Sequence, residues 1–138
     1  MSVMGRRVLA ATLLAGGMLI PGGCKDSNPV GEDGSPSNIV FPTSNISYSV
    51  SVQPLFSQAC NYSGCHGSDA PPNLVKLTSW GEMMATGPGV VVPKQPEVST
   101  LVLRIEGRGA RMPPSGLPLN LNQINGIRAW IVEGAKNN

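Results

Sequence analysis

Cys60-Asn61-Tyr62-Ser63-Gly64-Cys65-His66-Gly67 is the stretch of the 138-residue chain that decides how the rest is interpreted. It places two cysteines directly before the only histidine of the chain. Two thiols can bond to the two vinyl groups of a haem while the adjacent imidazole binds the iron. The run therefore predicts covalent attachment of haem through Cys60 and Cys65, with His66 as an axial ligand.

The spacing of the two cysteines leaves a second interpretation open. Four residues separate them, whereas the usual attachment run has about two. Asn61, Ser63 and Gly64 are residue types that tolerate bulges and turns, so the longer run is feasible. The alternative is a small disulfide loop between Cys60 and Cys65 in an exported protein.

The composition favours one small domain with little regular structure. Phe, Trp and Tyr make up only 4% of the chain, which is few for a core that must exclude water without a cofactor. Seventeen Gly and thirteen Pro predict short helices joined by long irregular connections. Without Arg6 and Arg7, eight of the ten Lys and Arg remain to balance eight Asp and Glu, and this neutrality argues against nucleic-acid binding.

The first residues have the pattern of an export signal. Arg6 and Arg7 precede an apolar run from Val8 to Ile20, which is too short for a comfortable membrane span. Three regions are therefore predicted. They are a lipoprotein-type signal peptide at residues 1–23, a flexible tether rich in Ser, Asn, Gly and Pro at residues 24–46, and a folded domain at residues 47–138.

Cys24 is the predicted site of a lipid anchor. It follows Pro21-Gly22-Gly23, which resembles the lipobox of bacterial lipoproteins, although Pro21 stands where that motif prefers Leu. The resemblance implies an exported protein held to a bacterial membrane, on the periplasmic side, by lipid on Cys24. Cleavage by an ordinary signal peptidase, which would leave a spare thiol, is the alternative.

Apolar residues at helical spacing predict short helices in the domain. One is expected at Val52–Ala59, where it delivers Cys60. A second is expected after a Thr78 cap, and a third opens at Pro96 and closes at Gly107. The residues expected to face the core from these helices are Val52, Leu55, Phe56, Ala59, Val98, Leu101, Val102 and Ile105, with Met83 and Met84 as packing in the second.

The last helix is expected to begin at Asn120, with Gln123 completing a relative of the capping box. Gly126 costs helix propensity, so it is expected to allow a close approach by another backbone, that of the Val52–Ala59 helix. The expected buried stripe consists of Leu121, Ile124, Ile127 and Ile131, with Trp130 beside it.

Arg111-Met112-Pro113-Pro114 is the second informative stretch. The prolines stiffen the loop, so the Met112 side chain can be held without a helix behind it. Met112 is therefore the predicted second axial ligand of the haem iron, while core packing is its ordinary alternative.

Arg111 is the preferred partner for a haem propionate, ahead of Arg104 and Arg108. A carbonyl of Ala70 or Pro71 is expected to orient His66.

These stretches together resemble the mono-haem class I cytochrome c fold, and most closely the planctomycete-type cytochrome c domain. The resemblance implies an all-α fold of three to five short helices around one covalently bound haem c. It also implies Cys60 and Cys65 as thioether anchors and His66 and Met112 as iron ligands. The gap between the cysteines departs from the pattern. The matching pieces run from Tyr48 to Ala135 and include Val52–Phe56, Cys65–Gly67, Pro93–Leu101, Arg104-Ile105, Met112–Pro114 and Arg128–Ala135.

Histidine and methionine ligands leave no open position on the iron, so the predicted function is electron transfer, not enzymatic catalysis. The expected partners are redox proteins and, through Cys24, the membrane; membership of a larger electron-transfer complex stays open. One alternative is a haem enzyme subunit or ligand sensor in which Met112 is absent from the iron. Another is a haem-free lipoprotein interaction module with a Cys60–Cys65 disulfide.

Overall fold

The computed structural model describes residue 31 and residues 33–86 and 89–138. The expected signal peptide at residues 1–23 and the expected lipid site at Cys24 lie outside the described residues, so both stay predictions. Among the described residues, none of the helices has the length and apolar composition needed to cross a bilayer.

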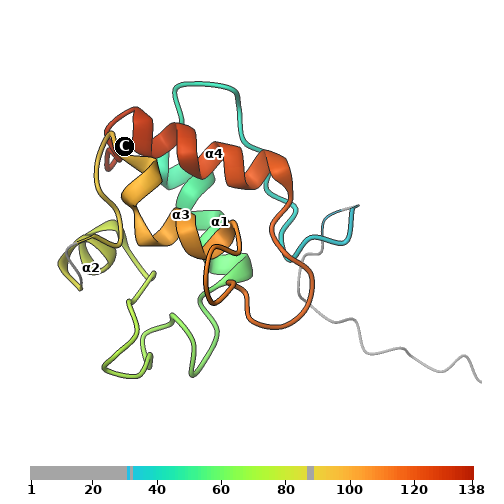
Figure 1. Cartoon of the computed structure of the whole chain (residues 1–138), viewed down its shortest axis with the longest axis vertical. Coiled ribbons are helices and arrows are strands. Elements are labelled where there is room, and N and C mark those ends of the chain that lie inside the picture. Colours follow the sequence, from blue (N-terminus) through green and yellow to red (C-terminus); the bar gives the residue numbers. More distant parts are fainter. Residues whose placement is uncertain (1–30, 32, 87–88) are drawn as a thin grey trace, which may run out of the picture.

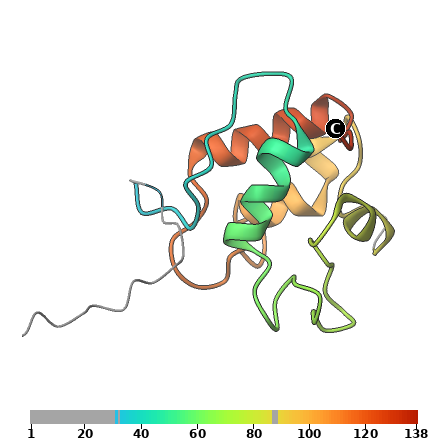
Figure 2. The ribbon, with the colours of Figure 1, turned by 180° about the vertical axis from the view of Figure 1, so that it is seen from behind.

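All regular structure in the described part of the chain is helical, which confirms the all-α prediction (Figure 1). The helices α1, α3 and α4 lie together, while α2 lies to one side of them (Figures 1 and 2). Long loops at the same end connect α1 to α2 and α3 to α4. The elements in chain order are η1 (Tyr48–Val52), α1 (Gln53–Ala59), α2 (Trp80–Ala85), η2 (Pro96–Val98), α3 (Thr100–Ile105) and α4 (Leu121–Val132).

The first helix forms where its apolar stripe predicts it. Ser47 caps η1 by accepting a hydrogen bond from the amide of Val50, and α1 continues with Pro54 in its first turn, where a missing amide costs little. The predicted stripe of Val52, Leu55, Phe56 and Ala59 is buried. This helix therefore ends with its apolar face fixed in the core and with Cys60 as its C-cap.

The second helix begins one residue later than expected. Ser79 is the cap, and its hydroxyl accepts from the amide of Glu82 at 3.2 Å, so Thr78 lies outside the helix. Met83 is fully buried and Met84 packs against the core from its edge, which confirms packing as their role. Both side chains lie on α2, away from the predicted axial position.

The helix expected from Pro96 to Gly107 is interrupted at Ser99. Ser99 is extended, and its buried hydroxyl accepts from the Val92 amide and donates to the Gln95 carbonyl, both at 2.9 Å. These bonds separate η2 from α3, so Val98 turns outward and is 56% exposed, contrary to prediction. The other three expected core residues, Leu101, Val102 and Ile105, are buried.

The last helix has the predicted cap. The Asn120 side chain accepts from the Gln123 amide at 2.9 Å, and the Gln123 side chain accepts from the Asn120 amide at 3.1 Å. Ile127, Trp130 and Ile131 are fully buried, and Ile124 packs at the edge of the core. Leu121 is 76% exposed, contrary to prediction, because it lies on the side of α4 away from the buried Gln123, Gly126 and Trp130.

Gly126 does permit a close approach, but the neighbour is not α1. A Cβ at this position would lie 2.1 Å from Cγ of Phe41. Phe41 is 3% exposed, and its amide and carbonyl both bond to the Asn122 side chain, at 2.8 and 3.0 Å. The predicted partner was therefore wrong: an aromatic side chain from a segment that precedes the expected domain fills the space at Gly126.

Residues 33–46, here called the strap, pack along α4 instead of hanging free. The buried Gln123 side chain donates to the carbonyls of Ser37 and Ile39 at 2.8 and 3.2 Å. At the other end of α4, Glu133 accepts from the amides of Asn45 and Ile46 at 2.7 and 2.8 Å. The sequence missed this because the strap has polar side chains and no helical period, while its backbone groups are satisfied by side chains of α4.

Candidate functional site

The run from Cys60 to His66 folds into a compact turn at the end of α1. The amide of Cys60 bonds to the Phe56 carbonyl at 2.9 Å and continues the helix by one step. The Cys60 carbonyl then accepts from the amides of Tyr62 and His66, at 2.9 and 3.3 Å. The extra residues of the run thus form a loop whose end, at His66, bonds back to Cys60. His66 therefore lies close to the helix end that carries Cys60.

Asp69 stabilises the tip of this turn. Its carboxylate accepts from the Ser63 hydroxyl at 2.5 Å and from the Gly64 amide at 3.3 Å. These bonds, the Ser63 bond first, lower the pKa of Asp69 from its ordinary value, although the carboxylate is exposed. Gly64 has φ of +73°, a conformation that glycine adopts without strain. The expectation that Ser63 and Gly64 accommodate a turn is confirmed.

His66 is oriented by a backbone carbonyl further along the chain than expected. Its Nδ1 lies 2.7 Å from the carbonyl oxygen of Val75. A carbonyl only accepts, so Nδ1 carries the proton and Nε2 keeps a lone pair for a metal. The predicted partners, Ala70 and Pro71, were wrong because the loop returns to His66 only at Val75 and Leu77.

That return is anchored to α1. The amide of Leu77 donates to the His66 carbonyl at 2.9 Å. The Leu77 carbonyl in turn accepts from the side chains of Gln53 and Asn61, both at 3.0 Å. The loop that orients the imidazole is therefore tied to α1 and to the cysteine run at once.

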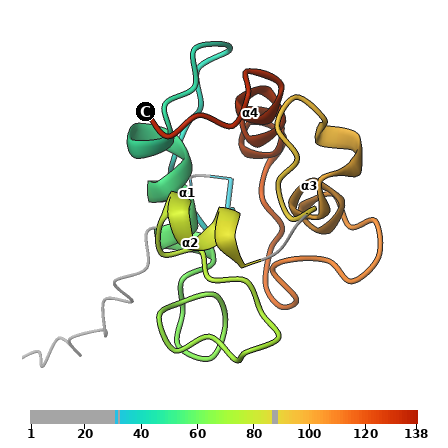
Figure 3. The same cartoon turned by 90° about the vertical axis from the view of Figure 1, so that its left-hand side faces the viewer.

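Met112 lies on the loop between α3 and α4, and its backbone is tied to α3. Its amide donates to the carbonyl of Arg104 at 3.0 Å. At the end of α3, Gly107 has φ of +76° and its amide bonds to the same carbonyl at 3.1 Å, which turns the chain back. In Figure 3 this loop and the loop after α1 lie at the same end of the molecule.

A cavity of about 460 Å³ lies between these loops and α3. Cys60, His66 and Met112 all line it, so the structure brings three of the predicted haem residues to one pocket. Its size falls within the range of about 300–1,000 Å³ that is usual for bound cofactors. The remaining wall is largely apolar, with Leu74, Val75, Leu77, Val90, Leu101, Ile105 and Leu119 among its residues.

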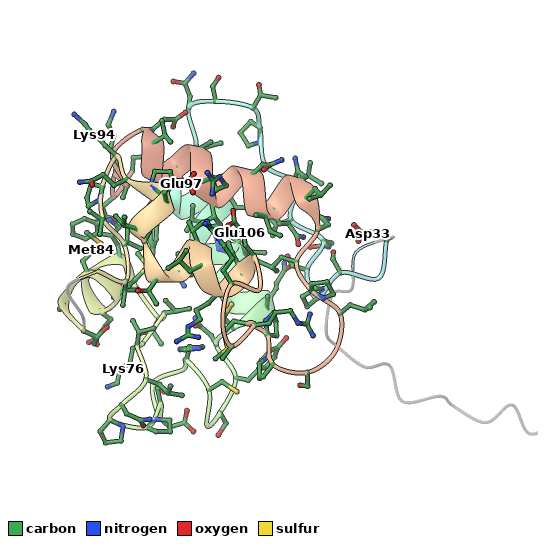
Figure 4. All side chains as sticks on the ribbon, viewed as in Figure 1. Asp33, Lys76, Met84, Lys94, Glu97 and Glu106 are labelled. Atoms are coloured by element: carbon green, nitrogen blue, oxygen red, sulfur yellow. The ribbon has the colours of Figure 1, made fainter. Side chains whose placement is uncertain are left out.

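The pocket wall carries positive charge and no carboxylate. Lys76 and Arg104 line it, and none of the lining residues is Asp or Glu. Figure 4 shows Lys76 on the loop after α1, and Glu97 and Glu106 on the other side of α3, toward α4. The sequence did not indicate Lys76 as a pocket residue. For Arg104 a signal was available, because it stands four residues after Thr100 and three after Leu101, on the helix face that lines the pocket.

Two predicted residues do not line this cavity. Cys65 and Arg111 are half-buried nearby, and the Arg111 guanidinium donates to the Gly116 carbonyl at 3.2 Å. The thiols of Cys60 and Cys65 are both free. Burial, and secondarily the neighbouring Cys65, raises the pKa of Cys60 to about 12, so Cys60 is held as a neutral thiol.

The residues present fit a haem. The pocket offers an apolar wall for the porphyrin, a histidine with a free Nε2, a thioether, a thiol and cations for carboxylates. Such a set satisfies each kind of group that a haem presents. The architecture that carries it is helical, as in the resemblance inferred from the sequence.

The comparison with protein families agrees with this geometry. Residues 63–116 match the family model of planctomycete cytochrome C. The match supports a cytochrome c-like chain and, with it, covalently bound haem c. It includes Cys65, His66 and Met112 but begins after Cys60. No curated protein and no solved structure gives a significant match to the chain.

The match is narrower than the resemblance drawn from the sequence. It spans less than half of the chain and leaves out the strap, α1 and α4. Most of the buried apolar residues lie outside the match, including Phe56, Ile127 and Trp130. The family match therefore says nothing about these elements.

Proposed function

We propose that the chain is a mono-haem c-type cytochrome that passes single electrons between redox proteins outside the cytoplasm. Cys60 and Cys65 are the thioether anchors, and His66 and Met112 are the axial ligands. The observation that carries this proposal is the meeting of Met112, from the loop after α3, with Cys60 and His66, from the turn after α1, in one apolar pocket.

The bound haem would supply a one-electron couple at its iron. The chain contributes the environment: Val75 holds the imidazole by its Nδ1 proton, and the loop that carries Met112 is tied to α3 through the Arg104 carbonyl. With both axial positions taken by the protein, oxygen and other small molecules are kept from the iron. This favours electron transfer over oxygen chemistry.

The proposed location is the periplasmic side of a bacterial membrane, with lipid on Cys24 as the anchor. Cys24 precedes residue 31, where the described structure begins, by seven residues. An extended residue spans about 3.5 Å at most, so the anchor would lie within about 25 Å of residue 31. A short tether of this kind keeps the haem edge near membrane-bound redox partners.

Intact mass of the mature protein tests the proposal. The chain is expressed with cytochrome maturation machinery and extracted in detergent. The expected mass is that of residues 24–138 plus one haem and acyl groups. A haem-free mass two hydrogens short would overturn the cytochrome assignment and support the disulfide module. A haem-loaded mass without acyl groups would overturn the lipid anchor alone.

The visible spectrum of the oxidised protein tests the ligand set. A charge-transfer band from methionine to iron is expected. A coloured protein that lacks this band and binds small ligands would favour the haem enzyme or sensor, because an open iron position is what those functions need.

A further inference from the structure

The pocket wall places a net positive charge where a dianionic ligand would bind. Arg104 and Lys76 line the cavity without any Asp or Glu. A haem carries two propionates, which are ionised at neutral pH, so the wall has the complementary charge. Arg104 is half-buried, and a charge removed from water in this way requires a charged or hydrogen-bonding partner.

The carboxylates nearest α3 are already engaged by other arginines. Arg108 pairs with Glu97 at 3.2 Å and with Glu106 at 2.6 Å. Arg128 of α4 pairs with Glu106 at 2.7 Å and also with Glu97. Among the described residues, no carboxylate pairs with Arg104 or Arg111. The arrangement therefore leaves Arg104, in the pocket wall, able to pair with an anion.

Local contacts hold the Arg104 side chain at the wall. Its Nη1 donates to the Ala110 carbonyl at 3.4 Å, which uses one of the five donors of a guanidinium. Gly109 lies against the same atom: it has φ of +100°, and a Cβ there would lie 3.0 Å from Nη1. The described residues engage none of its other donors, which can form the paired hydrogen bonds that carboxylates accept from arginine.

We infer that Arg104, and not its neighbour Arg111, pairs with a haem propionate and thereby stabilises the reduced state of the iron. This rests on the proposed cytochrome function. Arg111 directs its guanidinium to the Gly116 carbonyl and lies outside the cavity lining. Lys76 also lines the cavity, but its ammonium is a point charge and lacks the planar donor geometry of a guanidinium.

The sign of the effect follows from the charge balance. One electron added to the iron makes the haem more negative by one unit, so a nearby cation favours the reduced form. Loss of the Arg104 charge is expected to shift the one-electron equilibrium toward the oxidised form by on the order of tenfold. A tenfold change corresponds to a fall of about 59 mV in reduction potential.

The test is a redox titration of the haem-loaded protein and three variants, Arg104→Gln, Arg108→Gln and Arg111→Gln, with unchanged visible spectra as the check on ligation. Only Arg104→Gln is expected to lower the potential. Its potential should also fall as pH rises through the pKa of the unpaired propionate, while the wild-type potential stays flat over the same range. Arg104→Lys should restore part of the lost reduction potential, since lysine keeps the positive charge but lacks the paired donors of the guanidinium.

The outcomes separate this inference from the proposed function. A wild-type protein without haem overturns both. If the wild type carries haem but the reduction potential of Arg104→Gln is unchanged, or falls only in Arg111→Gln, this inference is overturned and the cytochrome proposal stands. If Arg104→Gln takes up no haem, Arg104→Lys decides: normal uptake supports the charge role, and failure of both variants assigns Arg104 to packing.

Discussion

Met112 and His66 come from different loops, and a backbone carbonyl orients each of them. The His66 ring is oriented by Val75, and the Met112 amide by Arg104. Neither partner could be read from local sequence, because a backbone carbonyl leaves no signature in residue type. The site therefore depends at residue scale on loop geometry as much as on its conspicuous side chains.

Met112→Leu tests the axial ligand, since it nearly conserves volume and removes only the thioether. We expect loss of the methionine charge-transfer band, binding of an added ligand such as imidazole, and a shift of at least about tenfold toward the oxidised form. Absorbance and redox titration measure these changes. Met84→Leu, which replaces a packing methionine on α2, is the matched control. An unchanged spectrum in Met112→Leu would show that another residue ligates the iron.

Cys60 has a pH-dependent reactivity that can be measured in haem-free protein. Because burial raises its pKa to about 12, the reactive thiolate is scarce at pH 7. Iodoacetamide should modify folded Cys60 on the order of a thousandfold more slowly than Cys60 in the denatured chain. The rate should rise about tenfold per pH unit until the pKa is approached. Peptide mass spectrometry follows the reaction, and equal rates in the folded and denatured chains would contradict the burial.

At the scale of elements, α4 packs against α3 and η2 and also holds the strap. Its cap and its buried Ile127 and Ile131 were predictable because both depend on spacing within one helix. The exposure of Leu121 could not be predicted, since it depends on which side of α4 its neighbours cover. The prediction that Val98 is buried was wrong for a related reason. The Ser99 hydroxyl bonds to Val92 and Gln95, and this interrupts the helix between Val98 and Thr100.

Gly126 and Phe41 provide a test of the contact between α4 and the strap. Gly126→Ala is expected to cost about 1–3 kcal/mol, because its methyl group would overlap the Phe41 ring. Phe41→Ala should cost about 3 kcal/mol through the cavity that it leaves. In the double variant the methyl group occupies part of that cavity, so the loss should be smaller than the sum. Urea denaturation measures all three, and additive losses would contradict direct contact.

At the scale of the whole molecule, the strap extends the folded unit beyond the expected domain start at residue 47. It buries Phe41 and Ile46 and satisfies polar groups along the length of α4. A protein with few aromatic residues gains a substantial share of its core from such a segment. The first residues of the strap lie near the start of α4, because the side chain of the Asn120 cap donates to Asp33 at 2.7 Å.

Truncation separates the strap from the residues before it. A chain that begins at residue 47 should be less stable than the full mature chain by about 2–5 kcal/mol, since it loses two buried apolar side chains but saves the ordering entropy of the strap. A chain that begins at residue 31 should keep the full stability. Urea denaturation of both haem-loaded proteins gives the comparison. Equal stability of the two truncated chains would mean that the strap contributes nothing.

The sequence by itself determined the helical class, the cysteine and histidine run, Met112 in its loop and the capped last helix, because each depends on residue type and short-range spacing. Only the tertiary structure decided that Val75 orients His66, that Phe41 fills the space at Gly126, and that Arg104 faces the pocket while Arg111 does not. Those facts depend on how loops with no regular period return to distant helices. Such returns are governed by backbone hydrogen bonds and shape, which residue identity alone does not encode.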